Sequence, residues 1–280
     1  ELGVEISTSS MNRWVHATAD KLYGLYAAQM ERVLSAGYIQ VDETTHPITD
    51  RPGSARKGYI WVVRSVLVPG VFFYYDKGSR SGEVVLKMLK GYQGALQTDG
   101  YAAYSIFEEK KGVLPLGCMA HVRRKFLEAL VSDERSRPFI EKISRLYWVE
   151  AEARIDKLQA HQVQKLRKEK SVPILGDLYS QIESLYHDKL TRYSDLQRKA
   201  INYAYHEWKA VVRYIENGNW SIDNNEGERR IKPVVLGRKN YMNYASHQGA
   251  SNGAYMYTLV ESCKMSGSSL SLISRTCYAL

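Results

Sequence analysis

Three segments typical of β-strands follow one another in the first third of the chain. They are YIQVDET, GYIWVVRSVLV and GVFFYYDKG, which begin at residues 38, 58 and 70. Each is rich in β-branched and aromatic residues, and turn-forming Pro and Gly separate them. Because the connections RPGSARK and PG are short, the three strands are expected to be antiparallel neighbours.

Helices and strands then alternate. The segment SGEVVLKMLKGY has its apolar residues at helical spacing, and GALQTDG reads as a fourth strand that ends at an acid. VLPLGCMAH is a fifth strand candidate, and VRRKFLEAL opens a helix. The order predicts an α/β fold with a five-stranded mixed sheet flanked by helices.

The chain has helical texture before the strands and for a long stretch after them. STSSMNRWVHATADKLYGLYAAQMERVLSAG predicts a helix capped by Ser9 or Ser10, and its abrupt start suggests a fragment of a longer protein. From 132 to 217 the apolar residues keep a helical period, with breaks expected at Pro173 and Gly176 and a loop at RKEKS. The texture therefore changes at about residues 37, 132 and 217.

Composition limits the classes of function. Hydrophobic residues make up 44% and charged residues 25%, which are globular values, and no apolar run is long enough to span a bilayer. The net charge of +9 favours a polyanionic partner such as nucleic acid, although solubility alone is an alternative reading. The cysteines Cys118, Cys263 and Cys277 are too widely spaced for a disulfide framework, which favours a reducing compartment.

Two acids occupy unusual positions in the predicted strands. Asp42 lies inside YIQVDET, where a carboxylate is costly unless it is paired or binds a metal, and Asp99 closes the fourth strand. Either one alone is more often a structural acid. A third acid could come from SIDNNEGERRIKP, residues 221–233, which by itself reads as a solvated charged helix face. Three acids from distant elements could together hold two Mg²⁺ ions for phosphodiester chemistry.

Five ordered motifs make the chain resemble a known family. GYIQVDET, LQTDGYAAY, GCMAHVRRKF, DNNEGERRIKP and LGRKNY resemble the successive motifs of the insertion-sequence-66 family of bacterial transposases. These are DDE transposases with a ribonuclease H-like catalytic domain. The resemblance covers nearly all of the 280 residues, and five motifs in order are far more specific than any one of them.

The resemblance implies metal-dependent DNA strand cleavage and strand transfer. It also implies a helical lead-in (1–37), a ribonuclease H-like core in two pieces (38–131 and 218–280) and an all-helical insertion domain (132–217). Asp42, Asp99 and Glu228 would be the catalytic metal ligands for two Mg²⁺ or Mn²⁺ ions. The partners would be double-stranded DNA, as transposon ends and target, and further copies of the chain, at least a dimer on DNA. The protein would work in the bacterial cytoplasm at the nucleoid, with no membrane. Residues expected to bind DNA or support the site are His121, Arg123, Arg124, Lys125, Asn224, Arg229, Arg238 and Lys239.

The choice between Glu226 and Glu228 rests on helical geometry and on the family motif. In a helix from about residue 223 or 224 to Pro233, Ile231 marks the inward face. At roughly 100° per residue, Glu228 lies about 60° from Ile231 and Glu226 about 140°. Glu226 is therefore expected to point outward and pair with Arg230.

Other interpretations stay open from the sequence. A nuclease on the same fold would cut without joining, and a DNA-binding remnant would have lost the metal chemistry. Cys118 and His121 have the spacing of half a zinc site, but no second pair of ligands is evident.

Overall fold

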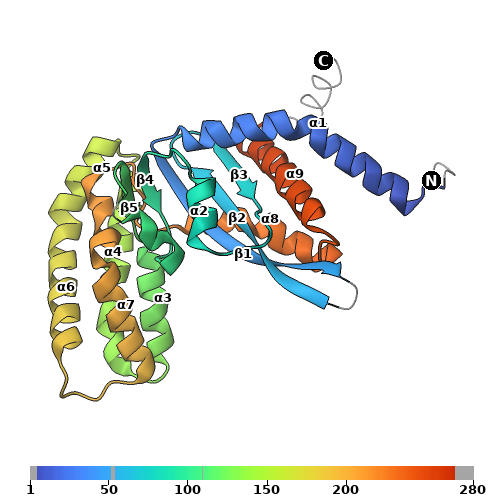
Figure 1. Ribbon diagram of the computed structural model, residues 1–280. Coiled ribbons are helices and arrows are strands. Elements are labelled where there is room, and N and C mark those ends of the chain that lie inside the picture. Colours follow the sequence, from blue (N-terminus) through green and yellow to red (C-terminus); the bar gives the residue numbers. More distant parts are fainter. Residues whose placement is uncertain (1–4, 52–53, 109, 269–280) are drawn as a thin grey trace. The chain divides into compact units, whose positions relative to one another are not determined.

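The computed structural model describes residues 5–51, 54–108 and 110–268 (Figure 1). Its helices and strands, with short single-turn segments labelled η, follow in this order: α1 (Thr8–Leu34), β1 (Tyr38–Arg51), β2 (Ser54–Ser65), β3 (Gly70–Tyr74), α2 (Gly82–Met88), β4 (Gly94–Gln97), η1 (Ala102–Phe107), β5 (Val113–Leu116), α3 (Met119–Leu130), η2 (Glu134–Ser136), α4 (Arg137–Ile155), α5 (Ala160–Leu166), η3 (Arg167–Ser171), α6 (Val172–His187), α7 (Asp195–Val212), η4 (Arg213–Glu216), α8 (Asn225–Tyr241) and α9 (His247–Ser266).

The five strands form one mixed sheet in the order β3-β2-β1-β4-β5. β1 pairs antiparallel with β2, from Ile39 opposite Ser65 to Arg51 opposite Ser54, and β2 pairs antiparallel with β3. The expected meander is confirmed, and so is the α/β class with a ribonuclease H-like sheet flanked by helices. Among the described residues, none of the helices is both long and apolar enough to cross a membrane.

Contacts divide the described chain into two compact units. The first contains the described residues within Glu1–Gly94, Ala102–Val113 and Glu226–Leu280, and the second contains Ala95–Tyr101 and Leu114–Asn225. Each unit has its own hydrophobic cluster, and β4 and α8 begin at the divisions between them.

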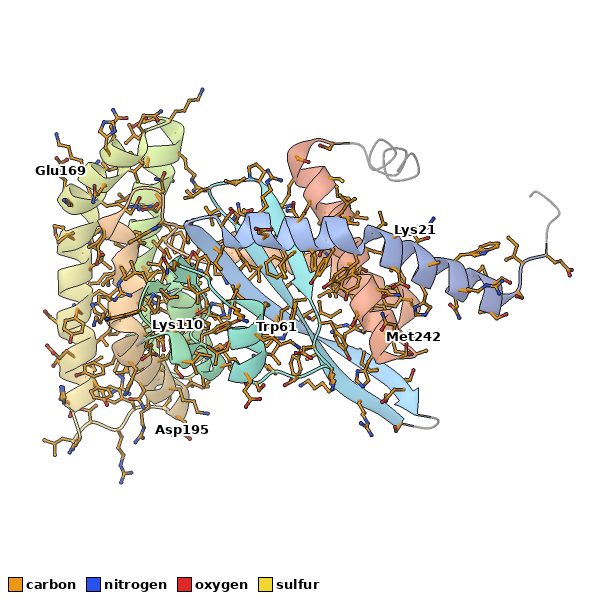
Figure 2. The ribbon with its side chains drawn as sticks, turned by 45° about the horizontal axis from the view of Figure 1, so that its top comes forward. Lys21, Trp61, Lys110, Glu169, Asp195 and Met242 are labelled. Atoms are coloured by element: carbon orange, nitrogen blue, oxygen red, sulfur yellow. The ribbon has the colours of Figure 1, made fainter. Side chains whose placement is uncertain are left out.

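The first unit is built on β1, β2 and β3. Helices α1 and α9 contact β3 and each other (Figure 1). The cluster beside them joins strand residues to α8 and α9; its fully buried members include Ile48, Ile60, Val62, Val71, Phe73, Val234, Ala250 and Ala254. Trp61, labelled in Figure 2, is completely buried on the other side of β2, where its ring meets Tyr104 edge-on at 6.1 Å.

The second unit is mainly a bundle of helices. α3 contacts α4 and α7, and α6 contacts α4 and α7, so these four helices lie side by side (Figure 1). The rings of Phe126 and Phe139 stack in its core at 4.5 Å. The helical texture predicted for this part of the chain is therefore observed.

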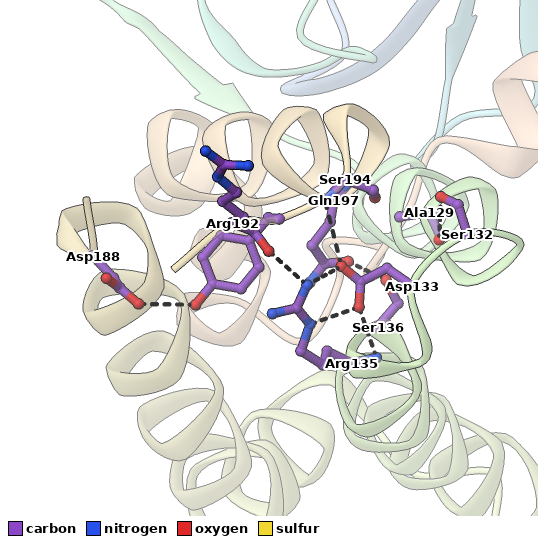
Figure 3. Close-up of polar contacts among 10 residues, drawn as sticks. Ala129, Ser132, Asp133, Arg135, Ser136, Asp188, Arg192, Ser194 and Gln197 are labelled. Carbon is purple, nitrogen blue, oxygen red and sulfur yellow. Dashed lines mark hydrogen bonds and ion pairs between the residues drawn. The ribbon is translucent and has the colours of Figure 1, made fainter. Parts of the chain in front are cut away.

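A polar cluster ties together two turns of this bundle (Figure 3). The Arg135 guanidinium donates to both oxygens of Asp133 at 2.7 Å and to the Arg192 carbonyl at 3.0 Å. Ser136 donates to Gln197, and both are fully buried. The turn after α3 is thereby fixed to the turn before α7.

Several local expectations were wrong. Ser7, rather than Ser9 or Ser10, caps α1, since its side chain accepts from the Ser10 amide. Most of RPGSARK belongs to β1 and β2, which are longer than predicted because their pairing extends to Arg51 and Ser54.

The segment RKEKS is a helical turn that continues into α6, and the expectation of a loop there was wrong. Among the charged residues of this segment, Arg167 is buried, with only 2% of its surface exposed. Pro173 follows this turn directly in the first turn of α6, and Gly176 lies within that helix, so neither residue produces the break that was expected.

Candidate functional site

Asp42 lies on the face of β1 that α8 covers. It is opposite Val62 of β2, and it is half-buried, with its Oδ1 accepting from the Glu43 amide at 2.8 Å. Val62 and Ile60 pack in the cluster that contains Ile231 and Val234 of α8. Since residues directly opposite on antiparallel strands share a face, Asp42 is on the α8 side of the sheet.

The neighbouring acid, Glu43, points to the opposite face and has a structural role. One of its oxygens accepts from the Arg80 guanidinium at 2.7 Å, and the other accepts from the Tyr104 hydroxyl at 2.8 Å. Its side chain is 2% exposed. Because successive side chains of a strand point to opposite faces of the sheet, Asp42 lies on the face covered by α8 and Glu43 lies on the other face.

The first turn of α8 carries Glu228 on the same side as the buried Ile231, one turn later. Ile231 and Val234 are in the core, so the predicted inward face of this helix is confirmed. The predicted end at Pro233 is wrong, because α8 continues to Tyr241. One missing backbone hydrogen bond is outweighed by packing on both sides of the proline.

Glu226 does not pair with Arg230 as expected. Its carboxylate pairs with Arg229, and its side chain is 44% exposed. Glu226 also lies close enough to Arg64 of β2 to raise the pKa of that guanidinium, which burial lowers more strongly. The expectation that Glu226 points toward solvent agrees with its exposure, but its partner on α8 is Arg229 rather than Arg230.

Arg64 is a half-buried cation on the Asp42 face of the sheet. Its guanidinium donates to the buried Gln40 at 2.7 Å, and Gln40 is two residues before Asp42. Burial lowers the pKa of Arg64, and Arg230 lowers it further. The sequence offered a signal for this residue, because it is a single cation within the apolar run IWVVRSV.

Asp99 belongs to the second unit, at the end of β4. Its Oδ1 accepts from the Tyr101 amide at 3.0 Å, and its carbonyl accepts from the Tyr203 hydroxyl at 2.7 Å. Gly100 between them has φ +77°, and a Cβ there would lie 2.8 Å from the Glu207 carboxylate. Only glycine allows both this conformation and this approach, so the turn after Asp99 is fixed closely against α7.

The segment that leads into α8 is attached to the same strand end. The buried Gln97 amide donates to the Gly117 carbonyl at 2.9 Å and to the Ser221 carbonyl at 2.8 Å. The Met119 amide donates to the Ile222 carbonyl, and the Asn224 amide donates to Cys118 Sγ at 3.3 Å. Asn224 is thus a buried structural anchor immediately before the helix that carries Glu228.

The remaining predicted residues have diverse surroundings. His121 Nε2 contacts the Arg124 guanidinium at 3.1 Å on α3, and Arg123 follows His121 on the same helix. Lys125 lies 3.9 Å from Glu128. Arg238 donates to the Thr45 carbonyl and hydroxyl, so it fastens α8 to β1, whereas Lys239 is exposed.

Cys118 and Cys263 are both buried thiols without a disulfide, and burial raises the pKa of Cys263. Cys277 lies outside the described residues. No pattern in the sequence pointed to Glu207 as a neighbour of the turn after Asp99. The exposure of Trp148 could have been predicted, because Trp148 does not share the helical period of Ile140, Ile143 and Tyr147.

The five-stranded mixed sheet and the helices that flank it place the chain in the α/β class that was expected, with a large helical part. Comparison with known families is consistent with this class and is more specific. A sequence model described as "Transposase IS66 family" matches residues 1–252. The chain belongs to this family, and the resemblance drawn from its five motifs is confirmed.

The curated relatives come from Sinorhizobium fredii and are described only as uncharacterized. The protein y4qI is 31% identical over 285 residues, which covers 95% of this chain and 51% of the relative. The protein y4hP is 28% identical, with 94% and 51% covered. The chain therefore spans about half the length of the curated relatives it matches. No solved structure matches the chain.

Proposed function

We propose that this chain is the catalytic part of a DNA transposase in which Asp42, Asp99 and Glu228 are the metal-binding acids. Family membership supports a role in transposition. The residue assignment, the cleavage and joining of DNA strands, and the assembly of at least two copies on DNA are parts of the proposal.

One observation carries the assignment: α8 is packed on the sheet, and the segment just before α8 is held by hydrogen bonds. Within the first unit, Ile231 and Val234 hold α8 on the face of β1 that bears Asp42. Within the second unit, Gln97 holds Ser221 at the end of the strand that runs into Asp99. Glu228 is four positions after Asn224 in the sequence, about one turn of helix. The helix that carries Glu228 thus packs on the strand of Asp42, and along the sequence it directly follows a segment held at the end of the strand that runs into Asp99.

The donor set suits Mg²⁺ or Mn²⁺, because all three residues offer carboxylate oxygens, the ligands that these hard cations prefer. Oδ1 of Asp42 accepts from a backbone amide, and a carboxylate has further lone pairs with which to bind a cation. Bound ions would activate the attacking hydroxyl and stabilise the leaving oxygen of a phosphodiester. Zinc at Cys118 and His121 is less well supported, since this pair supplies only two of the four ligands of a structural zinc site.

The chain's cations have a separate task in this proposal. Arg123, Arg124 and Lys125 on α3, with Arg229 and Lys239 on α8, would hold phosphates and so position DNA without reading its sequence. His121 would orient a phosphate or Arg124, which it already contacts. The helical stretch 132–217 would add further backbone contacts.

The test compares acid variants in cleavage and joining assays with end-labelled DNA and Mn²⁺. Asp42→Asn and Asp99→Asn should each reduce cleavage by about a thousandfold or more, if the carboxylate is as important as a single stabilising donor in other enzymes. DNA affinity should stay within about threefold, since removing a negative charge does not weaken attraction to a polyanion. Asp20→Asn, an exposed acid of α1, is the control for loss of one charge.

The products separate the alternatives. Joined strands together with cut strands support a transposase, and cut strands alone support a hydrolytic nuclease. DNA binding without any Mn²⁺-dependent cleavage by the 280-residue chain would support a binding remnant. Retained activity in either Asp variant would show that the acids are misassigned.

A further inference from the structure

A groove between α3 and α4 lies within the second unit and has a volume of about 800 Å³. We call it the α3–α4 groove. Its lining includes Arg123, Arg124, Tyr147, Trp148, Ile155 and Asn225.

The groove presents large apolar side chains to solvent. Trp148 is 77% exposed and Ile155 is 78% exposed, although both lie on α4, whose other face is in the core. Tryptophan is rarely this exposed in a folded chain, and an exposed aromatic in a concave site marks a binding surface. Packing within the unit does not account for Trp148.

Cations face the same groove from α3. Arg123 and Arg124 line it, and Arg123 is near enough to Tyr147 to lower the pKa of that phenol. Burial has the larger, opposite effect and, with Asp223 close by, keeps the pKa of Tyr147 above its ordinary value. The groove therefore combines an exposed indole, a neutral phenol and two guanidinium groups, which suits a ligand that is flat and anionic.

We propose that the α3–α4 groove binds a DNA nucleotide whose base is unpaired. Trp148 stacks on the base, and Arg123 and Arg124 contact the adjoining phosphates. An unpaired base is required because bases within a duplex are already stacked on one another and do not offer their faces to a side chain. The proposal depends on DNA being the substrate, as proposed above, but not on the identity of the catalytic acids.

Size and position agree with this occupant. A volume of about 800 Å³ is within the usual range for small-molecule sites, roughly 300–1,000 Å³, and a nucleotide fits such a space. Asn225, which lines the groove, is the first residue of α8, and Glu228 follows three residues later in the sequence.

The experiment measures the affinity of the 280-residue chain for three labelled DNAs without divalent metal, so that no cleavage occurs. The first is a blunt duplex, the second carries a single-stranded overhang, and the third carries the same overhang with abasic sites. Trp148→Ala should weaken binding of the overhang DNA about tenfold, the size expected from loss of one stacked base. The same variant should bind the blunt and abasic DNAs within about twofold of the unchanged chain.

Two variants control for folding and for general loss of apolar surface. Trp148→Phe keeps an aromatic face and should recover most of the affinity for the overhang. Trp14→Ala removes a tryptophan of α1 that is 53% exposed and should leave all three affinities unchanged. Unchanged circular dichroism of Trp148→Ala would show that the bundle stays folded.

Three results would overturn the proposal. One is an equal loss for Trp148→Ala on all three DNAs, which would make the groove a general DNA-binding surface. Another is no loss on any of them. The third is a change in oligomeric state with DNA affinity unchanged, which would assign the groove to a second copy of the chain. Tryptophan-dependent overhang binding by a chain that cuts no DNA would contradict only the proposed chemistry.

Discussion

The Tyr147 hydroxyl donates a 2.7 Å hydrogen bond to Oδ2 of Asp223. Asp223 in turn accepts from the Asn225 amide at 3.1 Å and from the Asn225 side chain at 2.8 Å. A residue of α4 therefore holds the turn from which α8 begins. Because burial and Asp223 keep the pKa of Tyr147 above its ordinary value, the phenol remains a donor across the pH range in which the protein would work.

Tyr147→Phe should lower the free energy of unfolding by about 1.5–3 kcal/mol, because it leaves a charged acceptor short of a buried partner. Tyr179→Phe is the matched control, since Tyr179 donates to Glu183 at 3.1 Å within an exposed helix face. Its loss should cost less than about 0.5 kcal/mol. Urea unfolding of both variants measures the two costs, and equal costs would show that the Tyr147 bond is not a special constraint.

Arg167 should be the charged residue whose loss damages the second unit most. It donates to both Glu150 oxygens, at 2.8 and 2.7 Å, and to the carbonyls of Tyr214, Asn217 and Trp220, so all five donors are used. Arg167→Met should lower the free energy of unfolding by about 3–5 kcal/mol, because it strands a buried acid and three carbonyls.

Lys170→Met is the control for Arg167→Met, because Lys170 pairs with Glu152 in the same stretch of chain but in solvent. An exposed pair is worth about 0–1 kcal/mol, so this variant should be nearly as stable as the unchanged chain. Thermal or urea unfolding would distinguish the two, and a small cost for Arg167→Met would mean that the network reorganises around the gap.

Glu228→Gln should remove Mn²⁺-dependent cleavage, whereas Glu226→Gln should leave most of it. Both lie in the first turn of α8, but Glu226 is 44% exposed and engaged by Arg229, and Glu228 lies one turn before the buried Ile231. The two substitutions are chemically identical, so each is the control for the other. The reverse ranking in a cleavage assay would make Glu226, beside Arg64, the third ligand.

Acid should destabilise the turn between α6 and α7 through Asp188. Hydrogen bonds from the Thr191 side chain, and then from the Thr191 and Leu190 amides, lower the pKa of Asp188 to about 2. The pKa of an aspartate in an unfolded chain is about 4. The contribution of the Asp188 carboxylate to the free energy of unfolding is therefore fully present above about pH 4, and it is lost as the pH falls from about 4 to about 2.

Asp188→Asn should flatten that part of the pH dependence, which urea unfolding midpoints between about pH 2 and about pH 7 can measure. The variant should be less stable than the unchanged chain at neutral pH and differ from it least at the acid end. A difference between the two chains that does not change with pH would show that the Asp188 carboxylate is not responsible.

DNA binding by the helical stretch 132–217 should fall steeply as salt rises, with exposed cations as the groups that bind phosphate. Arg154, Lys157 and Lys168 are exposed, whereas Arg167 is committed to the core. Replacing these three by Gln should reduce the slope of log affinity against log salt by about 0.9 for each phosphate that is no longer neutralised. Lys142→Gln, at a cation paired with Asp177 at 2.7 Å, should leave the slope unchanged. An unchanged slope for the triple variant would place the DNA elsewhere.

The sequence by itself determined the elements that depend on local patterns. Alternating β-branched and aromatic residues specified β1, β2 and β3, and short connections made them antiparallel. Apolar residues at helical spacing specified the helices of the second unit and the inward face of α8 at Ile231. These patterns are readable because burial of one face imposes a period of two or 3.6 on the chain.

Only the tertiary structure decided what depends on partners distant in the sequence. Arg167 looked like a loop residue until acceptors from several distant segments surrounded it. The partner of Glu226 proved to be Arg229 rather than Arg230, and only the fold showed that Trp148 shares a groove with two arginines of α3. A charge or an aromatic ring has no period, and its role is set by which groups the fold brings within a few ångströms of it.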